Sequence, residues 1–143
     1  MILIDANLLL YGYATGTEHH ERARQWLEEV FSEPAPVGLA WLGILAFLRI
    51  STHPRIFASP LSIAEAVSAV TSWLTQPSVR ILHPGERHWA ILSRLLPESQ
   101  ARGELVMDAH LAALAIEHGA VLCTSDRDFA RFPDLRVVNP LEG

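Results

Sequence analysis

The aspartates of this 143-residue chain are its clearest candidates for chemistry. Most of its eleven glutamates fall on predicted helix surfaces, where Glu is a good helix former. The five aspartates are placed differently. Asp5, Asp126 and Asp128 follow apolar runs that are typical of buried strands. Asp108 lies within a helical pattern, whereas Asp134 is an ordinary turn residue. The first four are therefore the candidates for a functional site.

Asp108 is the most informative of these acids. With Leu111, Ala112 and Ala115 it occupies positions i, i+3, i+4 and i+7, which form one face of a helix. Because this face is apolar, we expect the carboxylate to point inward. A buried charge of this kind is retained only when it is paired or bound to a metal ion. A salt bridge to an arginine such as Arg49 is the alternative explanation.

Asp5 and Asp126 each follow an apolar segment that predicts a strand of a parallel sheet. Ligands of such sheets bind beyond the carboxyl ends of the strands, so we expect both residues to converge with Asp108 on one crevice. Three carboxylates meeting there would repel one another, and clusters of oxygen ligands are what Mg²⁺ and Mn²⁺ prefer. Taken singly, Asp5 and Asp126 are each also explained as helix N-caps.

The elements that must position these acids alternate along the chain between short apolar strands and helices. Strands are predicted at residues 2–4, 37–40, 79–82, 120–124 and 136–138. Helices are predicted at residues 18–33, 41–51 and 104–118, and from Ser62 and Glu86, with a short helical turn at 128–131. The alternation predicts an α/β fold, a three-layer sandwich with a mostly parallel central sheet flanked by helices.

Two of these helices carry specific expectations. Ser62 and Glu65 have the spacing of a capping box, which marks a helix start. The helix from Glu86 is expected to bury Trp89. The side chains expected to point inward from the Ser62 helix are Ile63, Val67, Val70 and Leu74.

Length and composition limit the function classes. We expect one domain over residues 1–143, because this length supports a single core. No apolar run reaches the ~18 residues of a membrane span, and a basic leader is absent, so we expect a cytoplasmic protein with no membrane partner. Cys123 is the single cysteine, which excludes a cysteine zinc site. The histidine spacings match no common zinc motif.

The cations are also informative. All eleven are arginines, so mechanisms that need a lysine, such as those of phospho-receivers and haloacid-type phosphatases, are excluded. The segment after Asp5 lacks the glycine loop that nucleotide binding would require. The net charge is −5, which would ordinarily count against a nucleic-acid partner, but several acids are assigned to metal binding. Arginine pairs with phosphate in bidentate fashion. The candidates for contacts to phosphate are Arg49, Arg55, Arg102 and Arg127, although a solvated surface position or an ion pair in the core is the simpler explanation of each.

Four segments together resemble one known family. They are Ile-Asp-Ala-Asn at 4–7, Ala-Phe-Leu-Arg-Ile-Ser-Thr-His-Pro-Arg at 46–55, Met-Asp-Ala-His-Leu-Ala-Ala-Leu-Ala at 107–115 and Thr-Ser-Asp-Arg-Asp-Phe at 124–129. In this order and spacing the chain resembles PIN-domain proteins, and in particular VapC-type toxins of bacterial VapBC modules. The resemblance extends from residue 1 to residue 140.

The resemblance implies a PIN-like fold and an endoribonuclease that depends on Mg²⁺ or Mn²⁺. Such toxins cleave tRNA or rRNA and thereby inhibit translation. They are typically homodimers, and a VapB-type antitoxin protein neutralises them. PIN enzymes are thought to leave a 5′-phosphate and a 3′-hydroxyl group.

The resemblance also assigns roles to residues. Asp5 and Asp108 match the principal metal ligands, and Asp126 matches a later acid, so these three are the expected catalytic residues. Asp128 follows as a further candidate ligand. The residues that match supporting polar positions are Asn7 and Thr124.

One position departs from the family pattern. Many PIN nucleases have a glutamate on the helix after the second strand, where this chain has Ala46. Glu104 lies one turn before Asp108 and is a hypothetical replacement, although the sequence favours the explanation that it is a helix N-terminal acid stabilised by the helix dipole. Two readings without cleavage stay open. One is a PIN-like module that binds RNA or a partner, and the other is a protein that mainly builds an autoregulatory complex on DNA.

Overall fold

Five short parallel strands form the centre of the structure, a computed structural model that describes residues 1–142. The sheet order is β3-β2-β1-β4-β5, and every neighbouring pair is parallel. The strands are β1 (Ile2–Ile4), β2 (Val37–Leu39), β3 (Val79–Ile81), β4 (Val121–Cys123) and β5 (Val137–Val138). The strands therefore lie where the sequence predicts them, within one or two residues.

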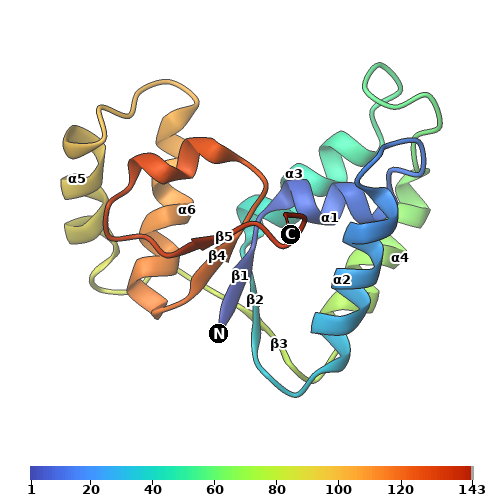
Figure 1. Cartoon of the computed structure of the whole chain (residues 1–143), viewed down its shortest axis with the longest axis horizontal. Helices are drawn as coiled ribbons and strands as arrows, with labels where there is room; N and C mark the ends of the chain where they lie inside the picture. Colours follow the sequence, from blue (N-terminus) through green and yellow to red (C-terminus); the bar gives the residue numbers. More distant parts are fainter. Residues whose placement is uncertain (143) are drawn as a thin grey trace.

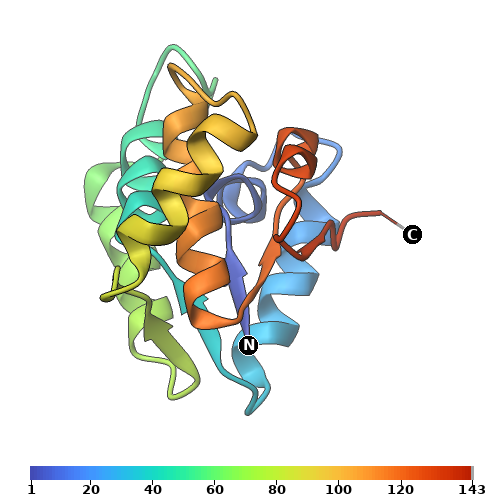
Figure 2. The ribbon, with the colours of Figure 1, turned by 90° about the vertical axis from the view of Figure 1, so that its left-hand side faces the viewer.

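Helices cover both faces of this sheet (Figure 1). The α-helices are α1 (Ala6–Tyr13), α2 (His20–Ser32), α3 (Trp41–Ser51), α4 (Ile63–Leu74), α5 (His88–Glu98) and α6 (Leu105–His118), and η1 (Arg127–Arg131) is a 3-10 helix. Helices α5 and α6 pack on one face, and α1 to α4 pack on the other. Figure 2 views the molecule from the α5–α6 side. The predicted three-layer α/β sandwich is confirmed.

The central strand β1 serves both halves of the core. Leu3 belongs to the apolar cluster under α5 and α6, whereas Ile4 belongs to the cluster under α1 to α4. Successive side chains of a strand point to opposite faces, so a short apolar run can anchor both layers. From β1 the chain builds β2 and β3 on one side, and β4 and β5 on the other. The strand order thus reverses between β1 and β4, where open α/β sheets bind ligands.

The helix ends follow the local sequence. The predicted capping box is confirmed, because the Ser62 hydroxyl accepts from the Glu65 amide at 3.0 Å and the Glu65 carboxylate accepts from the Ser62 amide at 2.9 Å. Helix α6 ends at Gly119, whose φ of 66° is left-handed and favours glycine. These stops fix the lengths of α4 and α6.

Two predictions of side-chain burial are wrong. On α4, Ile63, Val67 and Leu74 are exposed. The Trp73 indole packs edge-on against the Phe47 ring, with 4.7 Å between the ring centroids. This contact of the large indole sets the rotation of α4. The apolar face of α4 is broad, and the sequence pattern did not show which side of that face points inward. Trp89 on α5 is also exposed. The residues that α4 buries are Ala66, Ala69, Val70 and Trp73.

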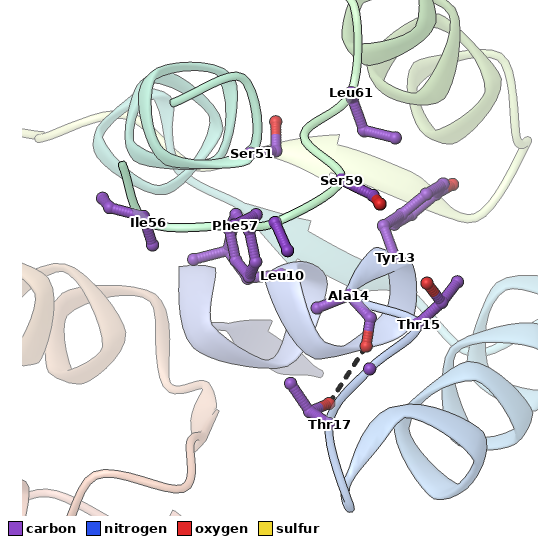
Figure 3. Close-up of a pocket in the computed structure, with 12 residues that line it drawn as sticks. Leu10, Tyr13, Ala14, Thr15, Thr17, Ser51, Ile56, Phe57, Ser59 and Leu61 are labelled. Atoms are coloured by element: carbon purple, nitrogen blue, oxygen red, sulfur yellow. Dashed lines mark hydrogen bonds between the residues drawn. The ribbon is translucent and has the colours of Figure 1, made fainter. Parts of the chain in front are cut away.

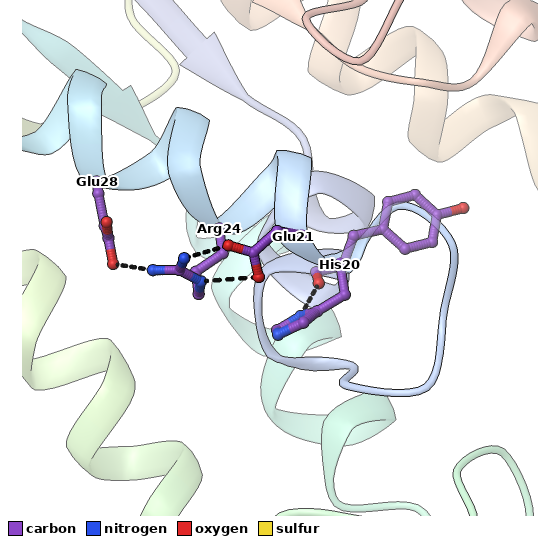
Figure 4. Close-up of polar contacts among 5 residues, drawn as sticks. His20, Glu21, Arg24 and Glu28 are labelled. Atoms are coloured by element: carbon purple, nitrogen blue, oxygen red, sulfur yellow. Dashed lines mark hydrogen bonds and ion pairs between the residues drawn. The ribbon is translucent and has the colours of Figure 1, made fainter.

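Polar contacts fix α2 against α1 and neutralise part of its surface. The His20 ring bonds to the Tyr11 carbonyl oxygen at 2.9 Å, and Arg24 forms ion pairs with both Glu21 and Glu28 (Figure 4). Arg24 is therefore engaged by acids of its own helix. Within residues 1–142, no helix combines the length and the apolar character that crossing a membrane requires.

Candidate active site

Asp5 stands at the point where the strand order reverses. Its amide donates to the Cys123 carbonyl at 3.0 Å, which continues the pairing of β1 with β4. Its carboxylate oxygen Oδ1 accepts from the Ala6 amide at 2.8 Å, so Asp5 is also the N-cap of α1. The N-cap explanation is therefore correct for Asp5, and the site role stays a prediction. Only one of the two carboxylate oxygens is used by the cap.

The Thr124 hydroxyl connects the acids of the site. It is 1% exposed and donates to Asp5 Oδ2 at 2.7 Å. The Thr124 hydroxyl oxygen also accepts hydrogen bonds from the Asp126 amide at 3.0 Å and from the Asn7 side-chain amide at 3.2 Å. One hydroxyl thus joins the ends of β1 and β4 to the start of α1. The supporting positions expected of Asn7 and Thr124 match this geometry.

The orientation of the Asn7 amide follows from these bonds. Since the Thr124 proton is given to Asp5, only the NH₂ group of Asn7 can donate to that hydroxyl. Asn7 Oδ1 is therefore turned away, and it is buried with no hydrogen-bond partner among residues 1–142. A buried amide oxygen without a donor is costly, by about 1–3 kcal/mol. It is also a suitable hard ligand, directly or through water, for a cation.

Three further carboxylates gather beside this network. One oxygen from each of Asp108, Asp126 and Asp128 lies within 4.8 Å of the others. Asp108 is in the first turn of α6, and Asp126 caps η1 by accepting from the Asp128 amide at 2.9 Å. These residues are far apart in the sequence, and they come together because α6 and η1 pack at the same edge of the sheet.

The electrostatics of the cluster are unfavourable without a cation. Burial raises the pKa of Asp108 to about 6, and the charges of Asp126, Asp5 and Asp128 add to this rise. Burial also raises the pKa of Asp5, against the opposing bonds from Thr124 and Ala6. The charges of the neighbouring acids thus act on both Asp5 and Asp108.

These residues fit a divalent cation of the Mg²⁺ type. The ligands offered are all oxygens, the carboxylates repel one another, and the Asn7 amide oxygen is unsatisfied. Asp108, Asp126 and Asp128 lie within coordinating distance of a common point, and Asp5 interacts electrostatically with Asp126 and Asp108.

The other expected residues are exposed at the surface. Arg127 is exposed and lies 3.6 Å from Glu142, and the remaining substrate candidates Arg49, Arg55 and Arg102 are exposed as well. Within residues 1–142, Asp108 forms no salt bridge with the exposed Arg49, so the salt-bridge alternative is wrong. Glu104 is exposed immediately before α6 and lies outside the three-acid cluster.

The sequence analysis missed Arg131. Its charge lowers the pKa of Asp108, and its Nε donates to the Asp128 carbonyl at 3.3 Å. A second bond, from Nη1 to the Ser99 carbonyl at 3.4 Å, fixes the guanidinium between η1 and the end of α5. The available signal was its position three residues after Asp128 in the predicted helical turn, since i and i+3 share a helix face.

Comparison with known proteins gives a consistent result. The family model "PIN domain" matches residues 2–135. Ribonuclease VapC37 of Mycobacterium tuberculosis is 42% identical over 140 residues, which cover 98% of this chain and 97% of the relative.

Two solved structures share the fold. VapBC2 from Rickettsia felis, bound to a promoter DNA fragment, superposes with a TM-score of 0.69 at 17% identity and covers 97% of this chain and 98% of its own. VapC20 of M. tuberculosis, a toxin that cleaves the sarcin–ricin loop, has a TM-score of 0.68 at 19% identity and covers 95% and 99%. At these identities the two structures support the fold alone.

Replacing the central hydroxyl should destabilise the site. Thr124→Val keeps the shape but leaves Asp5, Asn7 and the Asp126 amide without their shared partner, so we expect a loss of about 3 kcal/mol in unfolding free energy. Thr124→Ser retains the hydroxyl and should lose only about 1 kcal/mol, the value of one methyl group. Urea unfolding of both variants measures the difference. Equal stabilities would show that the hydroxyl does not organise the site.

Stabilisation by Mg²⁺ should depend on pH. The folded-state pKa of Asp108 is about 6, above the ordinary value of an aspartate, so in the metal-free protein its ionisation costs stability as pH rises from that ordinary value through about 6. A bound cation offsets this cost only once the carboxylate is ionised. We therefore expect Mg²⁺ to raise the melting temperature more at pH 7.5 than at pH 5. Asp108→Asn is the control and should reduce this difference. An Mg²⁺ effect that is the same at both pH values would contradict the assignment.

Proposed function

The chain belongs to the PIN-domain family and, within it, to the VapC group, and from this premise we propose that it is a metal-dependent endoribonuclease. It acts as the toxin of a type II toxin–antitoxin system. The observation that carries the proposal is the acid cluster of Asp108, Asp126 and Asp128 beside Asp5, at the reversal point of the sheet. Mg²⁺ is the favoured cation, and Mn²⁺ satisfies the same oxygen ligands.

The reaction that suits this site is hydrolysis of an RNA phosphodiester. A water oxygen attacks phosphorus, and the bond to the 3′ oxygen breaks, which leaves a 5′-phosphate and a 3′-hydroxyl group. A cation held by the four aspartates would supply an activated water and neutralise charge on the phosphate. The Thr124 bond fixes Asp5 Oδ2. A ligand held in one orientation loses little entropy on binding.

Arginines at the rim of the site are suited to the flanking phosphates. Arg131 is the first of these, because its charge interacts with the Asp108 carboxylate. Arg49, Arg55, Arg102 and Arg127 are exposed and extend the cationic surface. These contacts allow a protein of net charge −5 to approach RNA, since local cations rather than net charge meet the backbone.

We infer that the substrate is a loop of tRNA or rRNA, where unstacked bases are accessible. The relative VapC20 is described as cleaving the sarcin–ricin loop. It shares 19% of its residues with this chain, so its target is not carried over. Both RNA classes place the enzyme in the cytoplasm.

A VapB-type antitoxin is the proposed protein partner, because solved structures with this fold include VapBC complexes. We also infer a homodimer. Trp41 and Leu45 on α3 are exposed, as are Ile63 and Val67 on the adjacent α4. Large apolar side chains gathered on neighbouring helices are typical of an interface.

A second candidate function is favoured by Ala46. A side chain at Gly43 would lie 3.8 Å from both the Ile4 carbonyl oxygen and the Ala6 amide nitrogen, so this part of α3 packs against the start of α1. Ala46 follows three residues later, near the same helix face. The site therefore lacks a carboxylate that many PIN nucleases have there, which would suit a module that binds RNA without cutting it.

Cleavage should depend on the aspartates and on the cation. Incubated with total cellular RNA and Mg²⁺, the purified protein should produce discrete fragments, and EDTA should abolish them. Asp5→Asn should reduce the cleavage rate at least about 100-fold, because it removes charge and reorganises the Thr124 network. Asp134→Asn is the matched control. Asp134 pairs with Arg94 at 2.7 Å on the exposed surface, away from the cluster, so cleavage should persist. Equal rates for both variants would point to a contaminating nuclease.

Adding the missing carboxylate distinguishes the two functions. In a working nuclease, Ala46→Glu should lower the Mg²⁺ concentration for half-maximal cleavage several-fold, because another oxygen ligand strengthens a hard-cation site. Titration of cleavage rate against Mg²⁺ measures the change. Cleavage by the variant but none by the unaltered protein would favour the binding module.

A further inference from the structure

A cavity of about 290 Å³ lies at the carboxyl end of α1, away from the aspartates (Figure 3). Three segments enclose it: the end of α1 with the turn that follows, the last residue of α3, and the loop that leads to α4. The residues that line it are Leu10, Tyr13, Ala14, Thr15, Gly16, Thr17, Ser51, Ile56, Phe57, Ala58, Ser59 and Leu61.

Ser51 contributes an unsatisfied hydroxyl to this cavity. The residue is 4% exposed, and its Oγ has no hydrogen-bond partner among residues 1–142. A helical serine commonly bonds back to a carbonyl one turn earlier. The neighbouring Thr52 does so, donating to the Leu48 carbonyl at 2.7 Å, but Ser51 does not. A buried hydroxyl in this state retains its capacity to bond to a ligand group.

The walls of the cavity are held in place by their own bonds. The Leu61 amide donates to the Ser51 carbonyl at 2.9 Å, which closes the loop between α3 and α4 at its two ends. On the opposite wall, the Thr17 hydroxyl donates to the Ala14 carbonyl at 3.1 Å (Figure 3). The Tyr13 hydroxyl accepts from the Trp73 indole at 3.3 Å. The cavity is therefore formed before any ligand enters.

The lining selects a small, neutral and partly aromatic ligand. None of the lining residues is charged, so the cavity does not suit a phosphate. Tyr13 and Phe57 supply aromatic rings, while Ser51, Ser59 and Thr15 supply hydroxyls for a polar edge. The volume is at the lower end of ligand pockets, which suits one ring system rather than a larger molecule.

The rim and the position of the cavity connect it to RNA. Arg55 is exposed directly before Ile56 and Phe57, and within residues 1–142 no acidic partner of its guanidinium is recorded. It can therefore meet the phosphate of a nucleotide whose base is in the cavity. Helix α1 begins beside Asp5 and ends at the cavity. The length of this eight-residue helix separates Asp5 from the cavity by about 12 Å. A single strand bound at the aspartates can span this distance.

We propose that this cavity binds a nucleobase of the RNA substrate, splayed out of the strand a short distance from the cleaved phosphodiester. The inference rests on the proposed ribonuclease function and adds a site that selects the sequence. A base offers donors and acceptors to the unpartnered Ser51 hydroxyl and a ring face to Tyr13 and Phe57. An apolar side chain of a protein partner would leave that hydroxyl unsatisfied.

Cleavage of a random-sequence single-stranded RNA pool with Mg²⁺ tests the proposal. Sequencing of the product ends gives the base preference at each position around the cut, and the unaltered protein should show a preference at a position next to the cut. Ser51→Ala should weaken it roughly five-fold, the effect of one hydrogen bond. Ala58→Trp, made on the exposed loop, should fill the cavity and weaken it at least as much. Ala90→Trp, exposed on α5, is the matched control and should keep it.

Two results would overturn the proposal. One is cleavage by the unaltered protein with no base preference at any position. The other is the full base preference in both cavity variants; if these variants also lose binding to a VapB-type antitoxin, the cavity receives a protein side chain.

Photo-crosslinking separates this inference from the proposed function. Asp5→Asn, which should bind RNA without cutting it, is irradiated with the same pool carrying 4-thiouridine. Crosslinks on the peptides of Tyr13 or Phe57, abolished by a further Ala58→Trp and kept with Ala90→Trp, support the cavity even if the unaltered protein cuts nothing. Cleavage by the unaltered protein with crosslinks confined to other peptides would refute the cavity and leave the nuclease intact.

Discussion

Mutual repulsion among four carboxylates is the constraint around which this fold is arranged. Asp5 and Asp108 titrate above their ordinary range because burial and neighbouring acids penalise their charge. The fold tolerates this cost through the Thr124 hydroxyl, which joins Asp5, Asn7 and the Asp126 amide. Their bonds fix the geometry without neutralising the charge. The resulting site is poised for a cation, because the cation removes a cost that the rest of the structure leaves in place.

The core explains how Asp108 reaches that position. Ala109, Ala112 and Ala113 on α6 are completely buried, and such small side chains let a helix lie close to the sheet. Asp108 is in the first turn, where α6 passes the carboxyl ends of β1 and β4. On the opposite face, aromatic packing of Phe47 and Trp73 fixes α3 and α4. The two layers thus position the aspartates and the cavity at Ser51, which we propose to contact the same RNA strand.

The distribution of arginines gives the acidic protein its cationic surface. Some arginines are engaged by acids on the surface, as Arg24 is by Glu21 and Glu28. Exposed ion pairs of this kind add little stability, but they remove a cation from the set that can meet phosphate. Arg131, in contrast, is bonded to carbonyl oxygens, which orient its guanidinium without cancelling its charge. Arg131 therefore keeps a charge that is available to phosphate in the function proposed above, whereas Arg24 does not.

The sequence by itself determined the fold class and the core of the candidate site. Alternating apolar strands and helices specify the parallel sandwich, and strand-ending Asp5 and Asp126 specify its functional edge, because these signals are local in the chain. Tertiary structure alone decided which side of the broad apolar face of α4 is buried, because packing of the Trp73 ring against Phe47 sets the rotation of the helix. It also decided the proximity of Arg131 to Asp108 and the isolation of the Ser51 hydroxyl. Both depend on contacts between segments far apart in sequence, which no periodicity records.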